Sequence, residues 1–346
     1  MKRTTGILLV GLVLLAGCSK KAEPTTNPVP APPPAQQAEA TPKPPEPKAP
    51  EPISGPIYLL DKPASTLWPG PATVVVENSP QARPQSGLMD AHMVVESLTE
   101  SEITRFLAFF WEADVKKIGP VRSARNFSVR MAHAYHAPFL HAGGNMDALA
   151  MLRGEFGGAA NIDDIFTYGP AFYRSSDRVP PHNLYTTTAN ITQAISDRGI
   201  PMSAVPTTPR AEPVAAPEKP VSKVLVDWHK WHKLAWEWTG KAYQRLEDGT
   251  TPHTVDDGTV ITAPNLVFLW VQGEYMGGED GWVMYMDQGG KARVIAGGNQ
   301  WEGTWALGPG GFALQPAEGK ALPLVPGNVW VHLITPGSEV EVTAGN

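Results

Sequence analysis

Residues 103–141 read ITRFLAFFWEADVKKIGPVRSARNFSVRMAHAYHAPFLH, and this stretch decides the predicted fold. Its apolar, aromatic beginning, 103–111, predicts a buried strand, and Gly119-Pro120 then breaks the chain. A helix is predicted over 123–135 with Ser123 as its N-cap, and 137–141 predicts a further short strand. Strands that alternate with helices favour a mixed sheet that carries helices on its faces.

The same alternation continues on both sides of this stretch. Residues 72–77 (ATVVVE) predict a buried strand, whereas 91–98 fit either a short helix or an extended segment. A diglycine turn leads into a predicted helix over 146–153 capped by Asn145, and Thr187 or Thr188 begins a last helix that ends before Gly199. We therefore predict an N-terminal α/β sandwich with a mixed sheet over residues 57–200.

A proline-rich stretch, 201–220, is the predicted linker between two domains, because the regions on its two sides differ in texture. After it, short strand-like runs dominate, separated by turn signals such as Asp257-Gly258. Predicted strands cover 222–226, 242–246, 265–271, 281–286, 291–295, 303–306 and 329–334. The chain is therefore predicted to be α+β, with a smaller C-terminal barrel or roll of mostly β structure over 221–346.

Four tryptophans, at positions 228, 231, 236 and 238, lie at the start of this second region. Bulky indole rings fill the interior of small β-barrels, so we expect these side chains in the core and at its rim. The alternative is that an exposed subset, Trp228 and Trp231, stacks on a sugar or a peptide.

The first 18 residues, MKRTTGILLVGLVLLAGC, predict a signal peptide, because two cations precede an apolar run too short to span a membrane. The run ends in Leu15-Ala16-Gly17-Cys18, which resembles a bacterial lipobox, and Cys18 is the only cysteine in the chain. We expect diacylglyceryl and acyl chains such as palmitate on Cys18. They would anchor the exported protein at the outer face of the cytoplasmic membrane, or at an outer membrane if the host has one. Residues 19–56 predict a disordered, proline-rich stalk.

Composition excludes several classes of function. The net charge is −6 and no long run of lysine or arginine occurs, so nucleic acid is not an expected partner. The sequence contains no G-x-S-x-G motif, no P-loop and no dinucleotide-binding fingerprint, and no cofactor is expected. His133 with His136, and His229 with His232, repeat a spacing of three without an acidic third ligand in register, so no metal site is expected.

Polar clusters interrupt the first region where a plain scaffold would be apolar. Arginines flank the N-cap of the predicted helix 123–135, and the diglycine turn at 143–144 precedes another helix. Free amides at helix N-termini attract anions, and guanidinium groups add bidentate donors. We therefore predict a site for a phosphate, a pyrophosphate or a carboxylate. Its candidate residues are Arg105, Arg122, Arg125, His141, Asn145, Arg174, Arg178, His182 and Asn183.

The alternative is purely structural: the same arginines pair with acidic residues in a buried lattice of salt bridges. The acidic residues available for such a lattice are Glu96, Glu100, Glu102, Asp163, Asp164 and Asp177. The sequence leaves both interpretations open.

Several motifs resemble those of the YerB-like bacterial lipoproteins. These motifs are NSPQARPQSGL at 78–88, ITRF at 103–106, GPVRSAR at 119–125, HAGG at 141–144 and SDRVPPHNLY at 176–185. The resemblance covers most of the chain beyond the stalk and is looser in the second region. It implies an envelope lipoprotein with paired domains of unknown function, and it implies no known reaction.

These features predict a membrane-anchored envelope lipoprotein that binds an anionic envelope ligand, such as a cell-wall or phosphate-bearing molecule, or a partner. The alternative is a phosphotransferase or hydrolase acting on a lipid-linked cell-wall precursor, with Arg105, Arg122 and Arg125 stabilising phosphate charge. The order of strand, arginine-bearing turn, helix and diglycine turn is similar to that of the LytR–CpsA–Psr enzymes, which move polyprenyl-linked glycopolymers onto the wall. That similarity is an analogy at the level of fold.

Overall fold

The structure is a computed structural model. It describes residues 55–63, 67–100, 103–111, 114–158, 160–211, 217–229, 232–319 and 324–345. The predicted signal peptide, Cys18 and nearly all of the predicted stalk lie outside these residues. Within the described ranges, no helix is long and apolar enough to cross a membrane.

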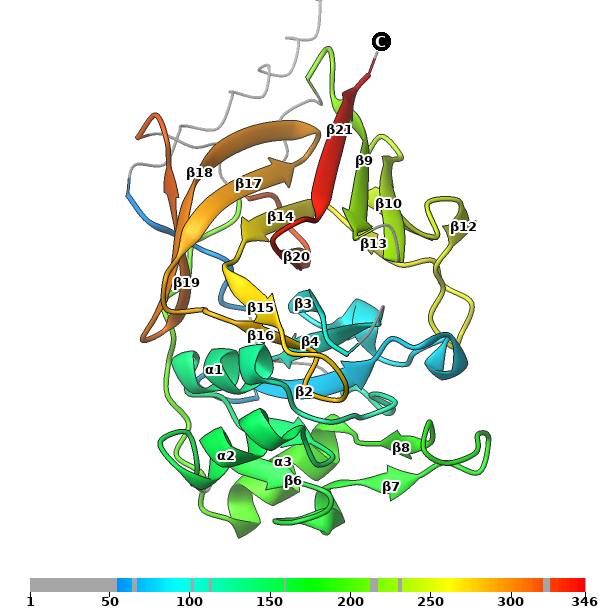
Figure 1. The fold of residues 1–346 in the computed structure, drawn as a ribbon, viewed down its shortest axis with the longest axis vertical. Coiled ribbons are helices and arrows are strands. Elements are labelled where there is room, and N and C mark those ends of the chain that lie inside the picture. The colour runs from blue at the N-terminus through cyan, green and yellow to red at the C-terminus, as the bar shows by residue number, and fades with distance from the viewer. Residues whose placement is uncertain are drawn as a thin grey trace, which may run out of the picture. The chain divides into compact units, whose positions relative to one another are not determined.

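The largest element of the fold is an 11-stranded mixed sheet with the order β1-β19-β18-β17-β14-β20-β3-β4-β2-β5-β6 (Figure 1). Most neighbours are antiparallel, but β14–β20, β20–β3, β2–β5 and β5–β6 are parallel pairs. Its strands are β1 (Ile57–Tyr58), β2 (Ala72–Glu77), β3 (Met93–Leu98), β4 (Thr104–Phe110), β5 (Phe139–His141), β6 (Asn161–Asp163), β14 (Asn265–Trp270), β17 (Gly290–Ala296), β18 (Asn299–Gly308), β19 (Gly311–Pro316) and β20 (Val329–Ile334).

A second sheet has six strands, with the order β12-β11-β10-β9-β21 and β13 paired to β11. The order is open at both ends among the described residues, so the structure does not confirm a closed barrel. Its strands are β9 (Val221–Trp228), β10 (His232–Trp238), β11 (Tyr243–Glu247), β12 (Thr251–Pro252), β13 (Thr262–Ala263) and β21 (Glu339–Ala344). Two separate hairpins pair β7 (Tyr173–Arg174) with β8 (Leu184–Tyr185), and β15 (Gly273–Tyr275) with β16 (Trp282–Met284).

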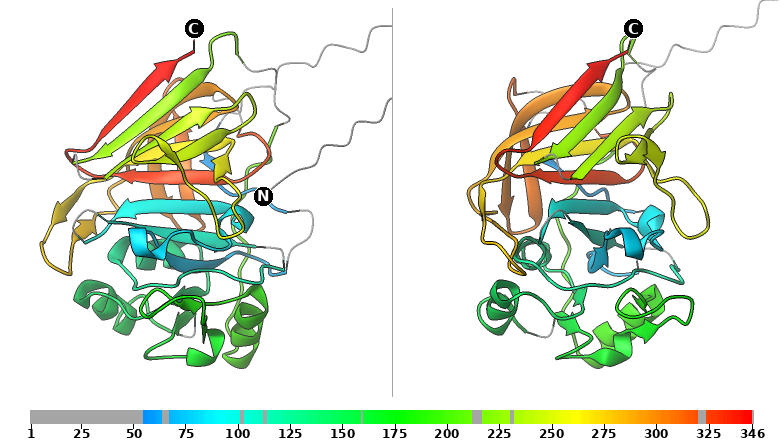
Figure 2. Two further views of the ribbon diagram at one scale, coloured as in Figure 1. Left: turned by 90° about the vertical axis from the view of Figure 1, so that its right-hand side faces the viewer. Right: turned by 45° about the vertical axis from the view of Figure 1, so that its right-hand side comes forward.

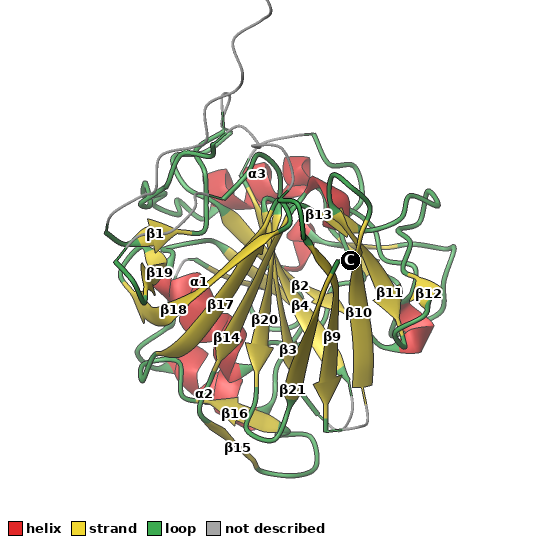
Figure 3. Cartoon of the chain, turned by 90° about the horizontal axis from the view of Figure 1, so that it is seen from above, coloured by secondary structure: helices red, strands yellow, loops and turns green. Residues whose placement is uncertain are grey.

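Three α-helices are described, all within the predicted N-terminal region 57–200: α1 (Asn126–Ala134), α2 (Met146–Arg153) and α3 (Thr188–Asp197). The helices and the second sheet lie on opposite sides of the strands β2 to β4 (Figure 2), and a view from above shows the strands lying over the helices (Figure 3). This arrangement confirms the α+β class and the expectation of helices on a mixed sheet.

The predicted helix starts agree with the structure at α2 and α3 but not at α1. The side chain of Asn145 accepts a hydrogen bond from the amide of Ala148, the third residue of α2, which confirms the predicted cap. The side chain of Thr187 accepts one from the amide of Asn190, the third residue of α3, so this helix starts where it was predicted to start. The cap predicted at Ser123 is wrong, because α1 begins only after Arg125. Residues 122–124 are extended instead, since the amide of Arg122 bonds the β2 backbone and that of Ala124 bonds Gly143. The undecided segment 91–98 is the strand β3.

The two halves of the chain share one sheet. β20, from the C-terminal half, pairs in parallel with β3, from Val329↔Met93 to Leu333↔Ser97. Residues Pro47–Asn346 also form a single compact unit. The domain boundary at 201–220 stays a prediction about the organisation of the sequence, because the sheet itself continues across it.

Two of the four tryptophans named above, Trp228 and Trp236, are core residues. Trp228 and Trp236 are both 0 % exposed, so Trp228 cannot be a stacking platform at the surface, and Trp231 lies outside the described residues. The Trp228 indole donates to the carbonyl of Leu333 in the first sheet at 3.3 Å. These rings therefore fill the space between the two sheets, as bulky aromatic side chains commonly do.

Candidate functional site

A cluster of polar side chains surrounds the carboxylate of Glu77 at the end of β2. Arg122 Nε lies 3.1 Å from Glu77 Oε1, and His182 Nδ1 lies 2.9 Å from Glu77 Oε2. The Ser79 hydroxyl donates to Oε1 at 2.9 Å. The carboxylate is almost fully buried, with 4 % of its side chain exposed, whereas Arg122 and His182 retain 28 % and 20 %. Arg122 and His182 therefore form the solvent-facing part of this cluster.

Backbone pairing brings three distant segments to this point. The chain after Gly119-Pro120 runs beside β2, with the Glu77 amide donating to Pro120 and the Arg122 amide donating to Val75. The Val121 amide in turn donates to the carbonyl of Leu184 at 2.7 Å, which places the loop that carries His182 next to the same strand. The site is thus built on sheet-like contacts rather than on a helix N-terminus.

A second cluster joins Arg105 and Arg125 to one carboxylate, Glu100. Arg105 Nη2 lies 2.5 Å from Glu100 Oε1, and Arg125 donates to Oε2 from Nε at 3.0 Å and from Nη2 at 2.6 Å. Burial alone would raise the pKa of Glu100, but the two guanidinium groups outweigh it and lower that pKa to about 2. Burial, with Arg125 nearby, lowers the pKa of Arg105 to about 10.

The two clusters show which of these arginines belong to a buried salt-bridge lattice and which remain available for an anion. Arg105 and Arg125 are enclosed, with 4 % and 8 % of their side chains exposed, and both belong to a salt-bridge lattice as the structural alternative predicts. Among the three arginines of these two clusters, Arg122 is the one whose side chain stays partly exposed to solvent. Three arginines face two carboxylates, Glu77 and Glu100, so the paired clusters carry one excess positive charge.

His141 and Asn145 are engaged elsewhere. The ring of His141 is fully buried, with Nδ1 2.7 Å from the carbonyl of Gly143 and Nε2 2.7 Å from Asn161 Oδ1. Asn145 caps α2 through its oxygen and donates from Nδ2 to the carbonyl of Asp280 at 3.1 Å. Both side chains have structural partners that hold the diglycine turn and the β15–β16 hairpin in place.

Arg174, Arg178 and Asn183 belong to the outer loop around the β7–β8 hairpin. Arg174 donates to Asn183 Oδ1 at 3.0 Å and lies 3.5 Å from a carboxylate oxygen of Asp164. Arg178 donates to the carbonyl of Pro84 at 2.7 Å. These contacts fasten the loop, so the nine predicted residues do not all converge on one site. Arg105, Arg122, Arg125 and His182 are the ones that the structure brings close together.

Sequence reasoning missed the largest buried polar network. Glu96 of β3 and Arg245 of β11 are both completely buried and join the two sheets through hydrogen bonds of 2.8 and 2.9 Å. Burial would raise the pKa of Glu96, but Arg245 and the neighbouring histidines hold it below its usual range. Aromatic rings enclose the guanidinium, with its Cζ 5.2 Å from the Trp330 ring centroid. A hidden charge pair of this kind leaves no local signal in the sequence.

Histidines extend this network. The Trp236 indole donates to His332 Nε2 at 3.0 Å, so Nε2 is unprotonated and the ring carries its proton on Nδ1, which lies 3.2 Å from Glu96. Burial lowers the pKa of His332 and favours this neutral form. Glu247 lies 2.5 Å from His253 Nδ1 and 2.8 Å from Arg83, whose side chain is 20 % exposed. The network therefore reaches from the interior to the surface at Arg83.

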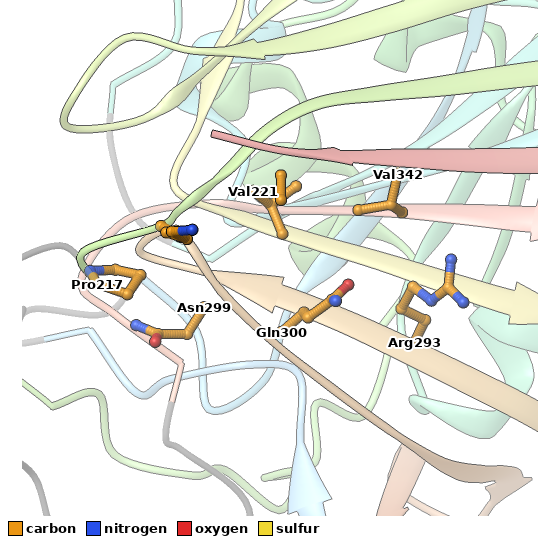
Figure 4. A pocket seen from close by; sticks show the side chains of 9 residues that line it. Pro217, Val221, Arg293, Asn299, Gln300 and Val342 are labelled. Carbon is orange, nitrogen blue, oxygen red and sulfur yellow. The ribbon is translucent and has the colours of Figure 1, made fainter. Parts of the chain in front are cut away.

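Two kinds of hollow lie away from these clusters. His133 and His136 line an apolar pocket of about 200 Å³ beside α1, and their ring centroids are 6.5 Å apart. No group of three or more metal-ligating side chains occurs in the part of the chain that the structure describes. A larger pocket of about 500 Å³ opens between β9–β21 and β17–β18, where Val221 and Val342 face Gln300 and Arg293 (Figure 4).

Comparisons with known proteins agree on one family. The model described as the N-terminal domain of proteins of unknown function DUF3048 matches residues 60–201, and the model of its C-terminal domain matches residues 224–331. A curated relative, "Putative lipoprotein YerB" from Bacillus subtilis (strain 168), is 31 % identical over 283 residues, covering 80 % of this chain and 84 % of the relative.

A solved structure supports the same assignment. The crystal structure of the YerB protein from Bacillus subtilis matches this chain with a TM-score of 0.66 and 28 % sequence identity, covering 79 % of this chain and 93 % of that one. The matched domains, the relative and the shared fold leave one conclusion: the chain belongs to the YerB-like family, which carries paired N- and C-terminal DUF3048 domains of unknown function.

Proposed function

We propose that this protein is an exported envelope lipoprotein, anchored through diacylglyceryl-Cys18, whose folded part binds an anionic envelope ligand at Arg122 and His182. The lipobox-like sequence and the similarity to a Bacillus subtilis protein named as a putative lipoprotein support the anchor. Export would place the folded part at the outer face of the cytoplasmic membrane, or at an outer membrane if the host has one. The proline-rich residues 19–56 would give it reach from the lipid.

One observation carries the ligand proposal: Arg122 and His182 are partly exposed above a buried carboxylate. The buried Glu77 carboxylate contacts both side chains, so the hydrogen-bond donors of Arg122 and His182 that it does not use are already positioned before a ligand binds. The excess positive charge of the neighbouring clusters favours a phosphate or carboxylate group there. Arg105 and Arg125 would act by supporting the electrostatic potential, because Glu100 and the carbonyls of Ser123 and Ala124 occupy most of their donors.

The test is a binding titration with a polyprenyl phosphate and with inorganic pyrophosphate, followed by thermal shift. We expect the wild-type protein to be stabilised by at least one of these probes, and Arg122→Gln to lose that stabilisation. Lys233→Gln is the matched control, because it also removes one exposed cation from an ion pair, at 2.8 Å from Asp227. Retained binding by Arg122→Gln, or an equal loss in Lys233→Gln, contradicts the proposal.

The alternative is a phosphotransferase or hydrolase acting on a lipid-linked wall precursor. Its supporting observation is the contact of His182 with Glu77 at 2.9 Å, next to Arg122, since a carboxylate-oriented imidazole is a possible general base. An enzyme would release a phosphate-bearing product from such a precursor, and Glu77→Gln would abolish that release because His182 would lose its orienting carboxylate. Binding without turnover favours the first proposal.

A further inference from the structure

β21 is the last strand of the second sheet and, among the described residues, it pairs with β9 alone. Val340 and Val342 pack against the hydrophobic core, whereas Glu339 and Glu341 are exposed on the outer face. The free side of an edge strand presents backbone N–H and C=O groups that can pair with another extended chain. β21 therefore has the geometry of a template for strand addition.

The 500 Å³ pocket lies directly beside this edge. Val342 and Ala344 of β21 line it on one side, and Arg293 and Gln300 of the first sheet line it on the other (Figure 4). Its volume falls in the range of about 300–1,000 Å³ that is typical of ligand sites. A side chain from a strand added to β21 could enter this pocket.

Beside β21, the strand β18 of the first sheet presents side chains that are exposed among the described residues. Alternate residues of β18, namely Gln300, Glu302 and Thr304, are exposed on the face that carries the pocket. An added strand would lie over this face, as β9 and β21 lie over the strands next to it. Such a strand would extend the second sheet and cover polar surface that is now open.

Charge indicates the chemistry of the occupant. Lys219 and Arg293 line the pocket, and Arg293 and Lys291 share one carboxylate, Glu302, at 2.6 and 3.3 Å. Of the described residues that line the pocket, two are cationic and none is acidic, in a chain whose net charge is −6. Acidic side chains therefore complement the pocket.

Two other occupants fit less well. None of the described residues that line the pocket is aromatic, whereas sugars commonly stack on aromatic rings. A second copy of β21, paired antiparallel across a two-fold axis, would bring Glu339 and Glu341 of the two chains together, and like charges on adjacent strands are destabilising.

We propose that the β21 edge and the adjoining pocket bind an extended acidic peptide by strand addition. The peptide backbone pairs with β21, and its inward-facing acidic side chains meet Lys219 and Arg293. This site is separate from the Arg122–His182 cluster, and neither proposal depends on the other.

The experiment is fluorescence anisotropy with the full chain in detergent micelles and a labelled octapeptide of alternating threonine and glutamate. Two further peptides carry N-methyl groups either on every threonine amide or on every glutamate amide. Because backbone amides of a strand alternate between its two edges, we expect only one of these peptides to lose binding. Arg293→Glu should weaken binding of the threonine–glutamate peptide about tenfold or more, and should favour a further peptide in which lysine replaces each glutamate.

Lys233→Glu is the matched control, because it reverses an exposed charge on β10, a strand that does not pair with β21, and that charge is paired with Asp227 at 2.8 Å. Circular dichroism of both variants verifies the fold. Equal binding of both N-methylated peptides, or equal weakening by the two variants, overturns the proposal. So does binding of wall glycan fragments in place of the peptide, or self-association that the peptide cannot displace.

Discussion

Replacing Arg245 by methionine is expected to destabilise the fold strongly, because the change leaves Glu96 buried without its counter-charge. Arg245 supplies two hydrogen bonds to Glu96, at 2.8 and 2.9 Å, and both side chains are 0 % exposed. Removing one partner of a buried ion pair costs about 3–5 kcal/mol. Thr104 still donates to Glu96 at 2.7 Å, which favours the lower half of that range.

The assay is urea unfolding followed by tryptophan fluorescence, since Trp236 and Trp330 lie against the Arg245 guanidinium. The matched control is Arg293→Met, which breaks a partly exposed pair with Glu302 and should cost less than about 1 kcal/mol. A double variant, Glu96→Leu with Arg245→Met, should recover most of the loss, because an apolar pair leaves no unpaired charge.

The pH dependence of the free energy of unfolding provides a second test, and the direction of the expected change is fixed. In the wild-type protein the pKa of Glu96 is below its usual range, so its stabilisation is present above the unfolded pKa and is lost as the pH falls. Without Arg245, burial raises that pKa, and the variant's deficit should shrink as the pH falls from 7 towards about 4. Equal losses in Arg245→Met and Arg293→Met, or a deficit independent of pH, would refute the reasoning.

Two further predictions rest on other contacts. The pKa values of Glu100 and Glu247 are each lowered to about 2 in the fold, so the stability that these carboxylates contribute to the fold should be complete above about pH 5 and should be lost between about pH 4.3 and 2. A series of thermal melts followed by circular dichroism measures this loss. A Tm that stays constant down to about pH 2.5 contradicts the prediction. Gly311→Ala should cost roughly 2–4 kcal/mol, because a Cβ there would lie 2.0 Å from Tyr135 Cζ and the residue has φ +104°. Gly308→Ala, at an open position of the paired strand, is its control in denaturant unfolding and should change stability by less than about 1 kcal/mol.

Local sequence patterns predicted most strands, the cap of α2 and the start of α3, because each depends on residues within a few positions of one another. The run 103–111 is the strand β4 within one residue at each end, and Asn145 caps α2. The cap at Ser123 failed because backbone pairing with β2 and with Gly143 keeps that segment extended. Such pairing joins residues that are distant in sequence.

The candidate site, too, combines features that the local sequence predicts with contacts that depend on distant residues. The sequence by itself identified the lipobox-like Cys18, the family resemblance and a group of arginines that need acidic partners. Only the tertiary structure decided the partners: Glu100 encloses Arg105 and Arg125, while Glu77 leaves Arg122 and His182 partly open.

The buried pair of Glu96 and Arg245 shows why the sequence could go no further. Every residue of β3 is buried, including the glutamate, and its partner lies 149 positions away on a strand of the other sheet. A charge can be stable there only because the fold supplies the opposite charge at hydrogen-bonding distance. Periodicity and composition determine which segments form strands and helices, but packing of the two sheets determines which charges meet.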